Sequence, residues 1–272
     1  MQPTHPAFDL ALSYPQWQGS GRAANLPRGA LAAAQVCAQF APLETVPSAG
    51  EGEARGGVNR WSAILAQFRS AQRILAARAP RRVLTAGGDC AADIAVIDYL
   101  HRRHPDLCVI WVDAHLDANT PRTTPSGNFH GMPVATLMGD APEEMRPLLG
   151  PPLDPARFRY VAAHVGDPGD WEFQNANGLQ WHEPGQAITG PVHIHFDLDA
   201  LVPAEFPYVA YPDGKLATEA GLSLVRGIAA SGDLVGLTIT EFAPADDAAA
   251  VHGGDFIRRL CEATGAQRLA TT

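Results

Sequence analysis

The fold of this chain is decided by the stretch Leu107-Cys108-Val109-Ile110-Trp111-Val112-Asp113-Ala114-His115-Leu116-Asp117. Its first six residues form an apolar run typical of a buried β-strand. Residues i, i+2 and i+4 of a strand point to one face, so Asp113, His115 and Asp117 are expected to converge. Carboxylates crowded together repel unless cations neutralise them, and oxygen-rich sets with an imidazole suit hard divalent ions such as Mn²⁺. The stretch therefore predicts a metal site at the carboxyl end of a strand.

A second cluster of the same design lies further along the chain. The apolar run from Val192 to Phe196 is followed by Asp197 and Asp199, again two carboxylates spaced by two residues. Carboxylates that merely cap strand ends would explain one such run well but two poorly, so metal binding is the favoured interpretation. His193 and His195 share the alternation of the two aspartates, so either can lie beneath the metals without ligating them.

The region before the first cluster has the pattern of a strand–helix–strand unit. Arg82–Ala86 is a predicted strand, Gly87-Gly88 a turn, Ala91–His104 a helix, and Leu107–Val112 the next strand, which predicts parallel pairing and a right-handed crossover. The other predicted strands span Ala7–Ser13, Phe158–Val165, Val192–Phe196 and Leu234–Thr240; the other predicted helices span Ala30–Ala41, Trp61–Ala79, Pro142–Leu148, Glu219–Ala230 and His252–Gly265; Pro42–Gly57 is a predicted loop. No linker or internal repeat interrupts these elements, so one domain over residues 1–272 is expected.

Composition narrows the class of protein. The 272 residues carry a formal net charge of −9, which argues against nucleic acid or an anionic membrane as a partner. No apolar run approaches the ~18 residues of a membrane span, and no basic segment with an apolar h-region opens the chain, so a cytoplasmic location is expected. The four cysteines show no framework spacing, which favours reduced thiols over disulfides.

Several motifs in order now resemble a known family. Asp113-Ala114-His115-Leu116-Asp117, with Gly87-Gly88-Asp89 upstream and Phe196-Asp197-Leu198-Asp199 downstream, is similar to the ureohydrolase superfamily of arginase, agmatinase and formimidoylglutamase. The loop from Asn119 to Gly131 is most similar to that of arginase. The resemblance implies a three-layer α/β/α domain with a mainly parallel sheet. It also implies metal-dependent hydrolysis of a guanidino or amidino C–N bond.

The resemblance assigns the metal ligands residue by residue. Two Mn²⁺ ions would be held by Cys90, Asp113, His115, Asp117, Asp197 and Asp199, with Asp113 and Asp197 as the bridging positions. Such a pair would lower the pKa of a water held between the ions and so supply a nucleophile near neutral pH.

Cys90 is the main departure from the family pattern, in which a histidine follows Gly-Gly-Asp. A thiolate can bind a divalent ion but prefers softer ions than Mn²⁺. Three interpretations stay open: Cys90 ligates, Cys90 is a bystander beside a weakly held ion, or the position takes a different metal. An inert buried thiol is the structural alternative.

The resemblance also assigns catalytic and substrate-binding roles. His130 would protonate the departing amine as a general acid, and Glu241 would hold a planar guanidinium through two parallel hydrogen bonds. The substrate-binding positions would be Asn119, Thr124, Ser126 and Asn128, on the loop that meets the α-carboxylate, and Asp167 near the α-amino group. A plain turn is the alternative for the Asp167-Pro168-Gly169 sequence.

The expected reaction is urea release from L-arginine or a related guanidino compound, in a homo-oligomer of the trimeric or hexameric kind found in the family. Two departures bear on the substrate: Val202-Pro203 stands where the family has Asp-Pro, and the bulky Tyr211 stands in a segment that is small in arginases. A change of pocket shape at Tyr211 would favour a substrate other than arginine. The alternative outside enzymes is a degenerate family member with an impaired metal site and a regulatory or assembly role.

Overall fold

The computed structural model describes residues 8–183 and 186–269. An eight-stranded sheet lies at its centre, in the order β2-β1-β3-β8-β7-β4-β5-β6, and every pairing in it is parallel. The strands are β1 (Leu10–Tyr14), β2 (Leu43–Thr45), β3 (Val83–Gly87), β4 (Cys108–Val112), β5 (Phe158–Val161), β6 (Gln180–Trp181), β7 (Pro191–Asp197) and β8 (Asp233–Thr240). The expected mainly parallel sheet is confirmed.

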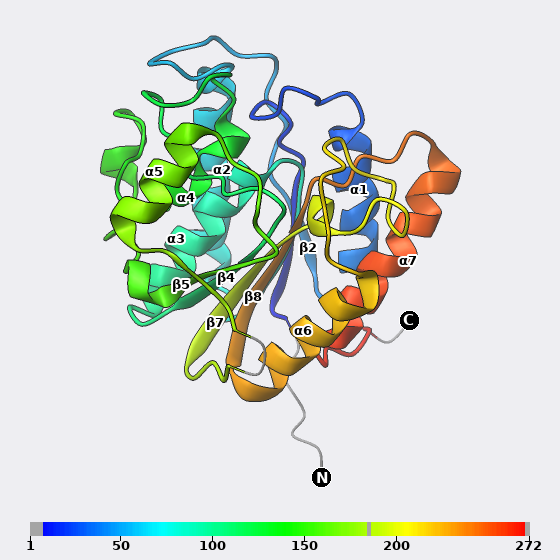
Figure 1. The fold of residues 1–272 in the computed structure, drawn as a ribbon. Helices are drawn as coiled ribbons and strands as arrows, with labels where there is room; N and C mark the ends of the chain where they lie inside the picture. The colour runs from blue at the N-terminus through cyan, green and yellow to red at the C-terminus, as the bar shows by residue number, and fades with distance from the viewer. Residues whose placement is uncertain (1–7, 184–185, 270–272) are drawn as a thin grey trace.

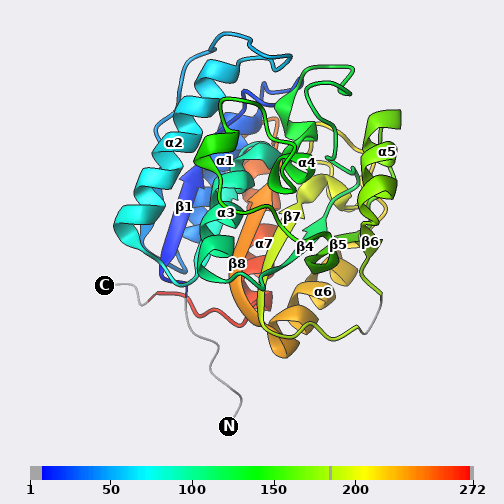
Figure 2. The same cartoon turned by 90° about the vertical axis from the view of Figure 1, so that its left-hand side faces the viewer.

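Helices cover both faces of the sheet, which confirms the expected three-layer α/β/α architecture (Figures 1 and 2). One face carries α2 (Trp61–Arg78), α3 (Ile94–Arg103), α4 (Pro133–Leu137) and α5 (Pro168–Asn177), and the other carries α1 (Leu26–Cys37), α6 (Thr218–Ser231) and α7 (Asp247–Ala263). Short 3₁₀ turns lie at Cys90–Asp93, Phe129–Gly131, Arg146–Leu148, Pro155–Arg157 and Leu198–Ala200. Two apolar cores, one on each side of the sheet, fill the space between the layers.

The central strands are buried on both faces. Every residue of β3 and β4 is buried, which explains why their sequences are continuous apolar runs rather than alternating ones. No helix within the described residues is long and apolar enough to cross a bilayer.

Some element boundaries differ from the sequence-based predictions. The helix predicted at Ala30–Ala41 is α1, which begins at Leu26 with a proline in its first turn. The strand predicted to reach Val165 ends at Val161, and Ala162 follows with a φ of 66°. The helix predicted at Pro142–Leu148 is wrong: only a 3₁₀ turn forms there, because a proline inside the segment removes a backbone donor.

Three other segments carry structure that was not expected. Part of the predicted loop Pro42–Gly57 forms the edge strand β2. The start of α7 lies at Asp247 rather than His252, because the Asp246 side chain accepts a hydrogen bond from the amide of Ala249 at 2.8 Å and caps the helix. The Asp167-Pro168-Gly169 sequence is the start of α5, with Asp167 as its N-cap, so the plain-turn alternative is wrong.

Strand order places the predicted motifs together. β4 and β7 are neighbours with Val112 opposite Phe196, so Asp113 and Asp197 leave the sheet side by side. β8 pairs with β7, and Asp197 lies opposite Thr240, the residue before Glu241. β3 pairs with the other edge of β8 and leads to Cys90. The carboxyl ends of these parallel strands point toward the upper side of the molecule in Figure 1, and ligands bind at this edge in such sheets.

Candidate metal and catalytic site

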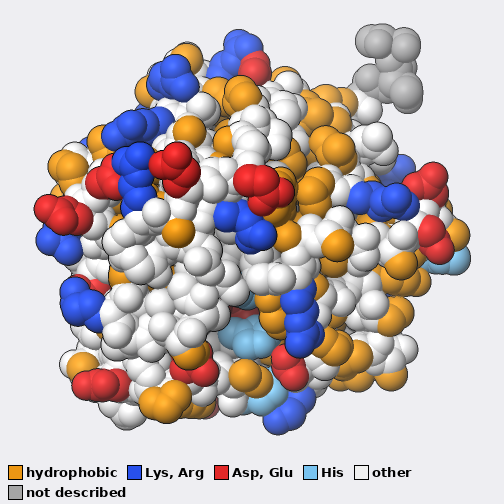
Figure 3. All heavy atoms as spheres, turned by 90° about the horizontal axis from the view of Figure 1, so that it is seen from above, with side chains coloured by type: hydrophobic (Ala, Val, Ile, Leu, Met, Phe, Trp, Pro, Cys, Tyr) orange, Lys and Arg blue, Asp and Glu red, His pale blue; other side chains and the backbone are white. Residues whose placement is uncertain are grey.

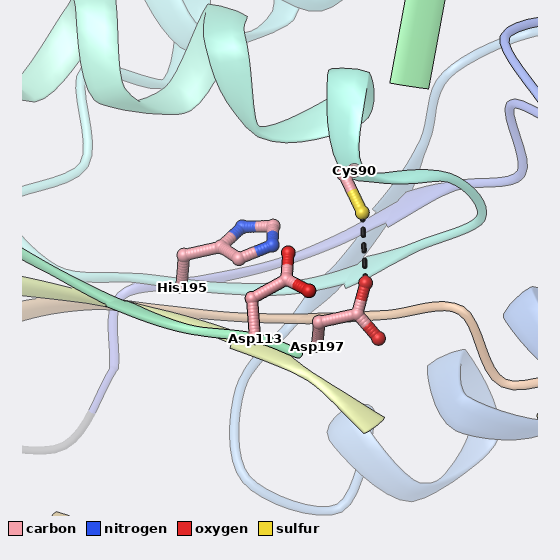
Figure 4. Close-up of side chains that lie close together, drawn as sticks. All are labelled: Cys90, Asp113, His195 and Asp197. Carbon is pink, nitrogen blue, oxygen red and sulfur yellow. Dashed lines mark hydrogen bonds between the residues drawn. The ribbon is translucent and has the colours of Figure 1, made fainter. Parts of the chain in front are cut away.

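Two groups of ligand-type atoms lie at the carboxyl ends of β4 and β7. The first consists of Cys90, Asp113, His195 and Asp197, and the second of Asp113, His115 and Asp199, with the ligand atoms of each group within 4.8 Å of one another. Figure 4 shows the first group converging from β4, β7 and the 3₁₀ turn after β3. Asp113 belongs to both groups and so lies between them.

The carboxylates of the first group are held in fixed positions. Trp111 Nε1 donates to Asp113 Oδ2 at 3.0 Å, and the amide of His115 donates to Asp113 Oδ1 at 2.7 Å. Asp197 Oδ1 accepts from the amide of Asp199 at 2.6 Å, and Asp197 Oδ2 accepts from the thiol of Cys90 at 2.8 Å. Burial, with the nearby charges of Asp197 and other carboxylates, raises the pKa of this thiol well above its usual value.

The second group is built around the His115 ring. Its Nδ1 lies 3.3 Å from Asp113 Oδ1 and 3.1 Å from Asp199 Oδ2. Burial would lower the pKa of His115, but its hydrogen bonds to Asp113 and Asp199 outweigh burial and raise that pKa. Burial and the charge of Asp113 raise the pKa of Asp199 to about 7.

Asp117 lies in neither ligand group. It is buried in a left-handed backbone conformation with φ of 49°, and its Oδ2 has no hydrogen-bond partner within residues 8–183 and 186–269. Burial and the charge of Asp113 raise its pKa, and the same causes, with Asp199 as a further charge, raise the pKa of Asp197. Buried carboxylates that repel one another, with an unpaired oxygen among them, fit a site for divalent cations.

A polar layer lies directly beneath the first group. Asp93 Oδ2 lies 2.8 Å from His193 Nε2 and 2.9 Å from His195 Nδ1, and Asp93 Oδ1 accepts from Thr238 Oγ1 at 2.6 Å. The sequence interpretation missed Asp93 and did not count His195 among the ligands. The parity of His195 with Asp197 on β7 had already placed this histidine beneath the metals, but parity alone could not separate it from His193.

His130 and Glu241 face each other at the mouth of the site. His130 Nδ1 lies 3.6 Å from Glu241 Oε1, while Glu241 Oε2 is buried without a hydrogen-bond partner. Burial would lower the pKa of His130, but the hydrogen bond and charge of Glu241 outweigh burial and raise that pKa. The pair can thus present a cationic donor beside a carboxylate acceptor.

Tyr211 and Asp213 narrow this mouth. The Tyr211 ring centroid lies 5.2 Å from that of His130 and 6.0 Å from that of His115, and Asp213 Oδ2 lies 3.4 Å from His115 Nε2. The guanidinium of Arg22 stacks over Tyr211 at 4.8 Å. Seen from above, histidine side chains are visible in a recess of this face (Figure 3).

The predicted substrate loop is hydrogen-bonded to α5 and to the turn that precedes α2. Asn119 Nδ2 donates to Asp170 Oδ2 at 2.7 Å and lies 3.3 Å from Asp167 Oδ2. Thr124 and Ser126 are in hydroxyl contact at 3.4 Å, and Asn128 Oδ1 accepts from Asn59 Nδ2 at 3.0 Å. Asp170 and Asn59 were missed. The acidic residue three positions after Asp167, which completes a capping box, was the available signal for Asp170.

Comparison with known proteins places these features in a family. The sequence model described as "Arginase family" matches residues 36–261. The chain is 34% identical to an arginase of Eremothecium gossypii over 68% of this chain and 52% of that protein, and 34% identical to Arginase-1 of Bos taurus over 59% of this chain and 58% of that protein. The matched regions thus span little more than half the length of these relatives.

The solved structures agree in fold. Entamoeba histolytica arginase, in complex with L-ornithine, superposes with a TM-score of 0.79 over 94% of this chain and 96% of that chain at 19% identity. An arginase from Bacillus subtilis gives a TM-score of 0.77 over 96% of this chain and 99% of that chain at 21% identity. At such identities the likeness concerns the fold alone, whereas the family model covers most of the sequence. The chain belongs to the arginase family.

Proposed function

We propose that this chain is a metal-dependent hydrolase that cleaves a guanidino C–N bond and releases urea. The observation that carries the proposal is the placement of the His130–Glu241 pair at the same sheet edge as the two ligand groups. Membership of the arginase family supports it.

Two divalent ions, with Mn²⁺ as the first candidate, would be held by the ligand groups around Cys90 and His115, with Asp113 shared and Asp117 beside them. They would supply a water of lowered pKa as the nucleophile. The unpaired Asp117 oxygen and the mutually repelling aspartates support cations at this place.

Glu241 would bind the guanidinium. Its Oε2 has no hydrogen-bond partner among the residues that the structure describes, and the neighbours of its Oε1 are distant, with His130 at 3.6 Å and Cys90 at 3.9 Å. A carboxylate with both oxygens available accepts two parallel N–H bonds from a planar guanidinium. His130, whose pKa is raised by Glu241, would deliver its proton to the nitrogen of the departing amine.

The substrate we propose is L-arginine or a related guanidino compound that carries polar groups at its far end. Asn119, Thr124, Ser126, Asn128 and Asp167 are the positions proposed to bind that end. The Tyr211 ring against His130 supports a pocket of altered shape, and the relative that binds L-ornithine is matched here in fold only. Assembly into a trimer or hexamer remains part of the proposal, and sedimentation would test it.

A non-catalytic role is the second candidate. The feature that favours it is Cys90, a thiol of raised pKa that donates to Asp197, where family members have an imidazole. A chain that folds like arginase but holds one ion poorly would serve as a regulatory or assembly subunit. Urea release by the purified, Mn²⁺-loaded protein separates this candidate from the hydrolase.

The experiment is a urea-release screen over guanidino compounds with wild type and two variants. His130→Asn should lower kcat by ~10²–10⁴-fold, the usual cost of a lost general acid, with little change in KM. Glu241→Gln should mainly raise KM because the guanidinium loses a charged partner. His252→Asn, an exposed histidine on α7, is the matched control and should match wild type. Unchanged kcat in His130→Asn together with unchanged KM in Glu241→Gln would remove both proposed roles.

A further inference from the structure

His195 occupies an unusual position for a core histidine. Its side chain is fully buried on β7, and its ring stacks on Trp111 with centroids 3.5 Å apart and planes 3° from parallel. Nδ1 lies 2.9 Å from Asp93 Oδ2. Two independent contacts, a flat aromatic face and a carboxylate, therefore fix both the position and the rotation of the ring.

The other ring nitrogen of His195, Nε2, faces the first ligand group. A carboxylate only accepts, so Nδ1 donates to Asp93 and Nε2 is left with its lone pair. The nearest hydrogen-bonding neighbour of Nε2 is Thr240 Oγ1, at 3.3 Å. Figure 4 shows the ring directed at the Asp113 carboxylate beside Asp197 and Cys90, the three side chains with which it forms the first group.

Asp93 has the features of a support for a ligating histidine. It is fully buried and receives three bonds, from His193, His195 and Thr238. Burial alone would raise the pKa of Asp93, but the two histidines outweigh burial and hold that pKa below its usual range. Histidines that bind metals commonly donate their other ring N–H to such a carboxylate, which fixes the tautomer and orients the ring.

His193 provides a comparison within the same strand. It shares the Asp93 carboxylate through Nε2, but its Nδ1 lies against Gly236 and it belongs to neither ligand group. If the layer had a purely structural role, the two histidines would be expected to have equivalent contacts. Their contacts differ, because of the two only His195 has a ring nitrogen close to Cys90, Asp113 and Asp197.

We propose that His195 is a metal ligand and that, with Cys90, Asp113 and Asp197, it forms a mixed sulfur–nitrogen–oxygen position that prefers Zn²⁺ or Co²⁺ to Mn²⁺. One thiolate, one imidazole and two carboxylates are a donor set that suits Zn²⁺, whereas the group around His115 contains only imidazole and carboxylate and suits harder ions. His195 on β7 would thereby supply the imidazole that is absent at position 90. The inference deepens the proposed hydrolase site and rests on that proposal for its biological role, while its test needs no turnover.

The test is a cobalt titration of the metal-free full-length protein. The first equivalent of Co²⁺ should produce a thiolate-to-cobalt charge-transfer band, and Zn²⁺ should displace it far more readily than Mn²⁺. Cys90→Ser should abolish the band, and Cys108→Ser, a buried thiol on β4 away from the site, should keep it. A band that persists in Cys90→Ser would overturn the assignment.

His195→Gln should weaken the cobalt affinity of this position by roughly 100-fold or more, and Asp93→Asn by about 10–100-fold with the band retained. His193→Gln, which loses the same Asp93 contact, is the matched control and should change the affinity far less. Equal losses in His193→Gln and His195→Gln would show that the layer acts only through packing.

Wild-type protein provides a second measurement if a core variant does not fold. X-ray absorption of the protein loaded with one equivalent of Zn²⁺ should show one sulfur at about 2.3 Å and one imidazole nitrogen at about 2.0–2.1 Å. Sulfur without imidazole, or imidazole without sulfur, would overturn the proposal. A sulfur–imidazole site in a protein that releases no urea would leave this inference intact and remove the proposed hydrolase activity instead.

Discussion

Asp117 and Glu241 share a left-handed backbone conformation that their local sequence does not predict. Both are non-glycine residues in the left-handed region, with φ of 49° and 59°, and both have one buried carboxylate oxygen without a partner. A left-handed non-glycine residue typically costs about 1–3 kcal/mol and persists where the surrounding structure over-determines it, often at functional sites. The strain at these two residues supports a role for each carboxylate in the site rather than in stabilising the fold.

At the residue scale, Glu241→Gln should move the ionisation of His130. The hydrogen bond and charge of Glu241 raise the pKa of His130, so the pair stabilises the folded state below about pH 6.5 and loses that contribution as pH rises through the raised pKa. Without the carboxylate the pKa of His130 should fall. The ¹⁵N resonances of the His130 ring should then titrate at lower pH, and the alkaline limb of kcat should move in the same direction.

Glu205→Gln is the control for this experiment, because Glu205 is an exposed carboxylate bonded to Thr218 and distant in sequence from the site. It should leave the His130 titration in place. If the His130 ring titrates at the same pH in wild type and Glu241→Gln, the raised pKa has another source.

At the scale of elements, α1 positions the segment that follows Glu241. A Cβ placed on Gly29 would lie 1.6 Å from the carbonyl oxygen of Phe242, so the helix backbone packs directly on the chain leaving β8. Only a residue without a side chain permits this approach. The sequence of α1, rich in alanine, gave no sign that its single glycine supports the site.

Gly29→Ala should therefore destabilise the protein by at least about 3 kcal/mol, since the clash is with backbone and cannot be relieved by a side-chain rotation. Any variant that folds should also bind substrate weakly, because Glu241 must move with Phe242. Gly227→Ala on α6 is the matched control: nothing lies within 4 Å of its Cβ position, and it should gain about 0.5–1 kcal/mol from helix propensity. Chemical denaturation of both variants measures the difference, and similar free energies of unfolding would contradict the proposed contact.

At the scale of the molecule, the site concentrates negative charge at one edge of the sheet. Asp113, Asp117, Asp197 and Asp199 are all buried there, and burial together with mutual repulsion raises the pKa of three of them (Asp117, Asp197 and Asp199). Burying several carboxylates with one principal cationic partner, His115, costs stability in the absence of metal. Cations that bind only the folded state should therefore increase the free energy of unfolding.

Mn²⁺ at about 100 times its Kd should stabilise the protein by ~2.7 kcal/mol per site, which corresponds to a rise in Tm of roughly 5–10 °C for a chain of this size. Asp113→Asn should lose most of this rise because Asp113 belongs to both ligand groups. Asp106→Asn, an exposed aspartate, should keep it. Thermal unfolding with and without Mn²⁺ tests this, and a wild-type Tm that does not change with Mn²⁺ would contradict a manganese site.

Local sequence was sufficient for the sheet and for most of the candidate site residues. The central strands are rich in apolar residues and are buried, so β3, β4, β7 and β8 were predicted to within a few residues. Carboxylates at alternate positions after such runs pointed to one edge of the sheet, because parallel strands end together there. Other elements have no apolar run in their sequence that marks where they begin. The boundaries of α5 and α7 depend on capping, and β2 depends on edge pairing, so α7 was misplaced and α5 and β2 were missed.

Only the tertiary structure decided which groups meet. Asp93 and His195 are 102 residues apart, and their 2.9 Å contact exists because the order of the sheet brings the 3₁₀ turn Cys90–Asp93, which follows β3, to β7. The same packing brings the His195 nitrogen to Cys90 and leaves Asp117 outside both ligand groups. The sequence by itself determined the kinds of side chains at this edge and the strands that carry them. Their pairing depends on contacts between distant segments, and a local pattern of residues contains no information about those contacts.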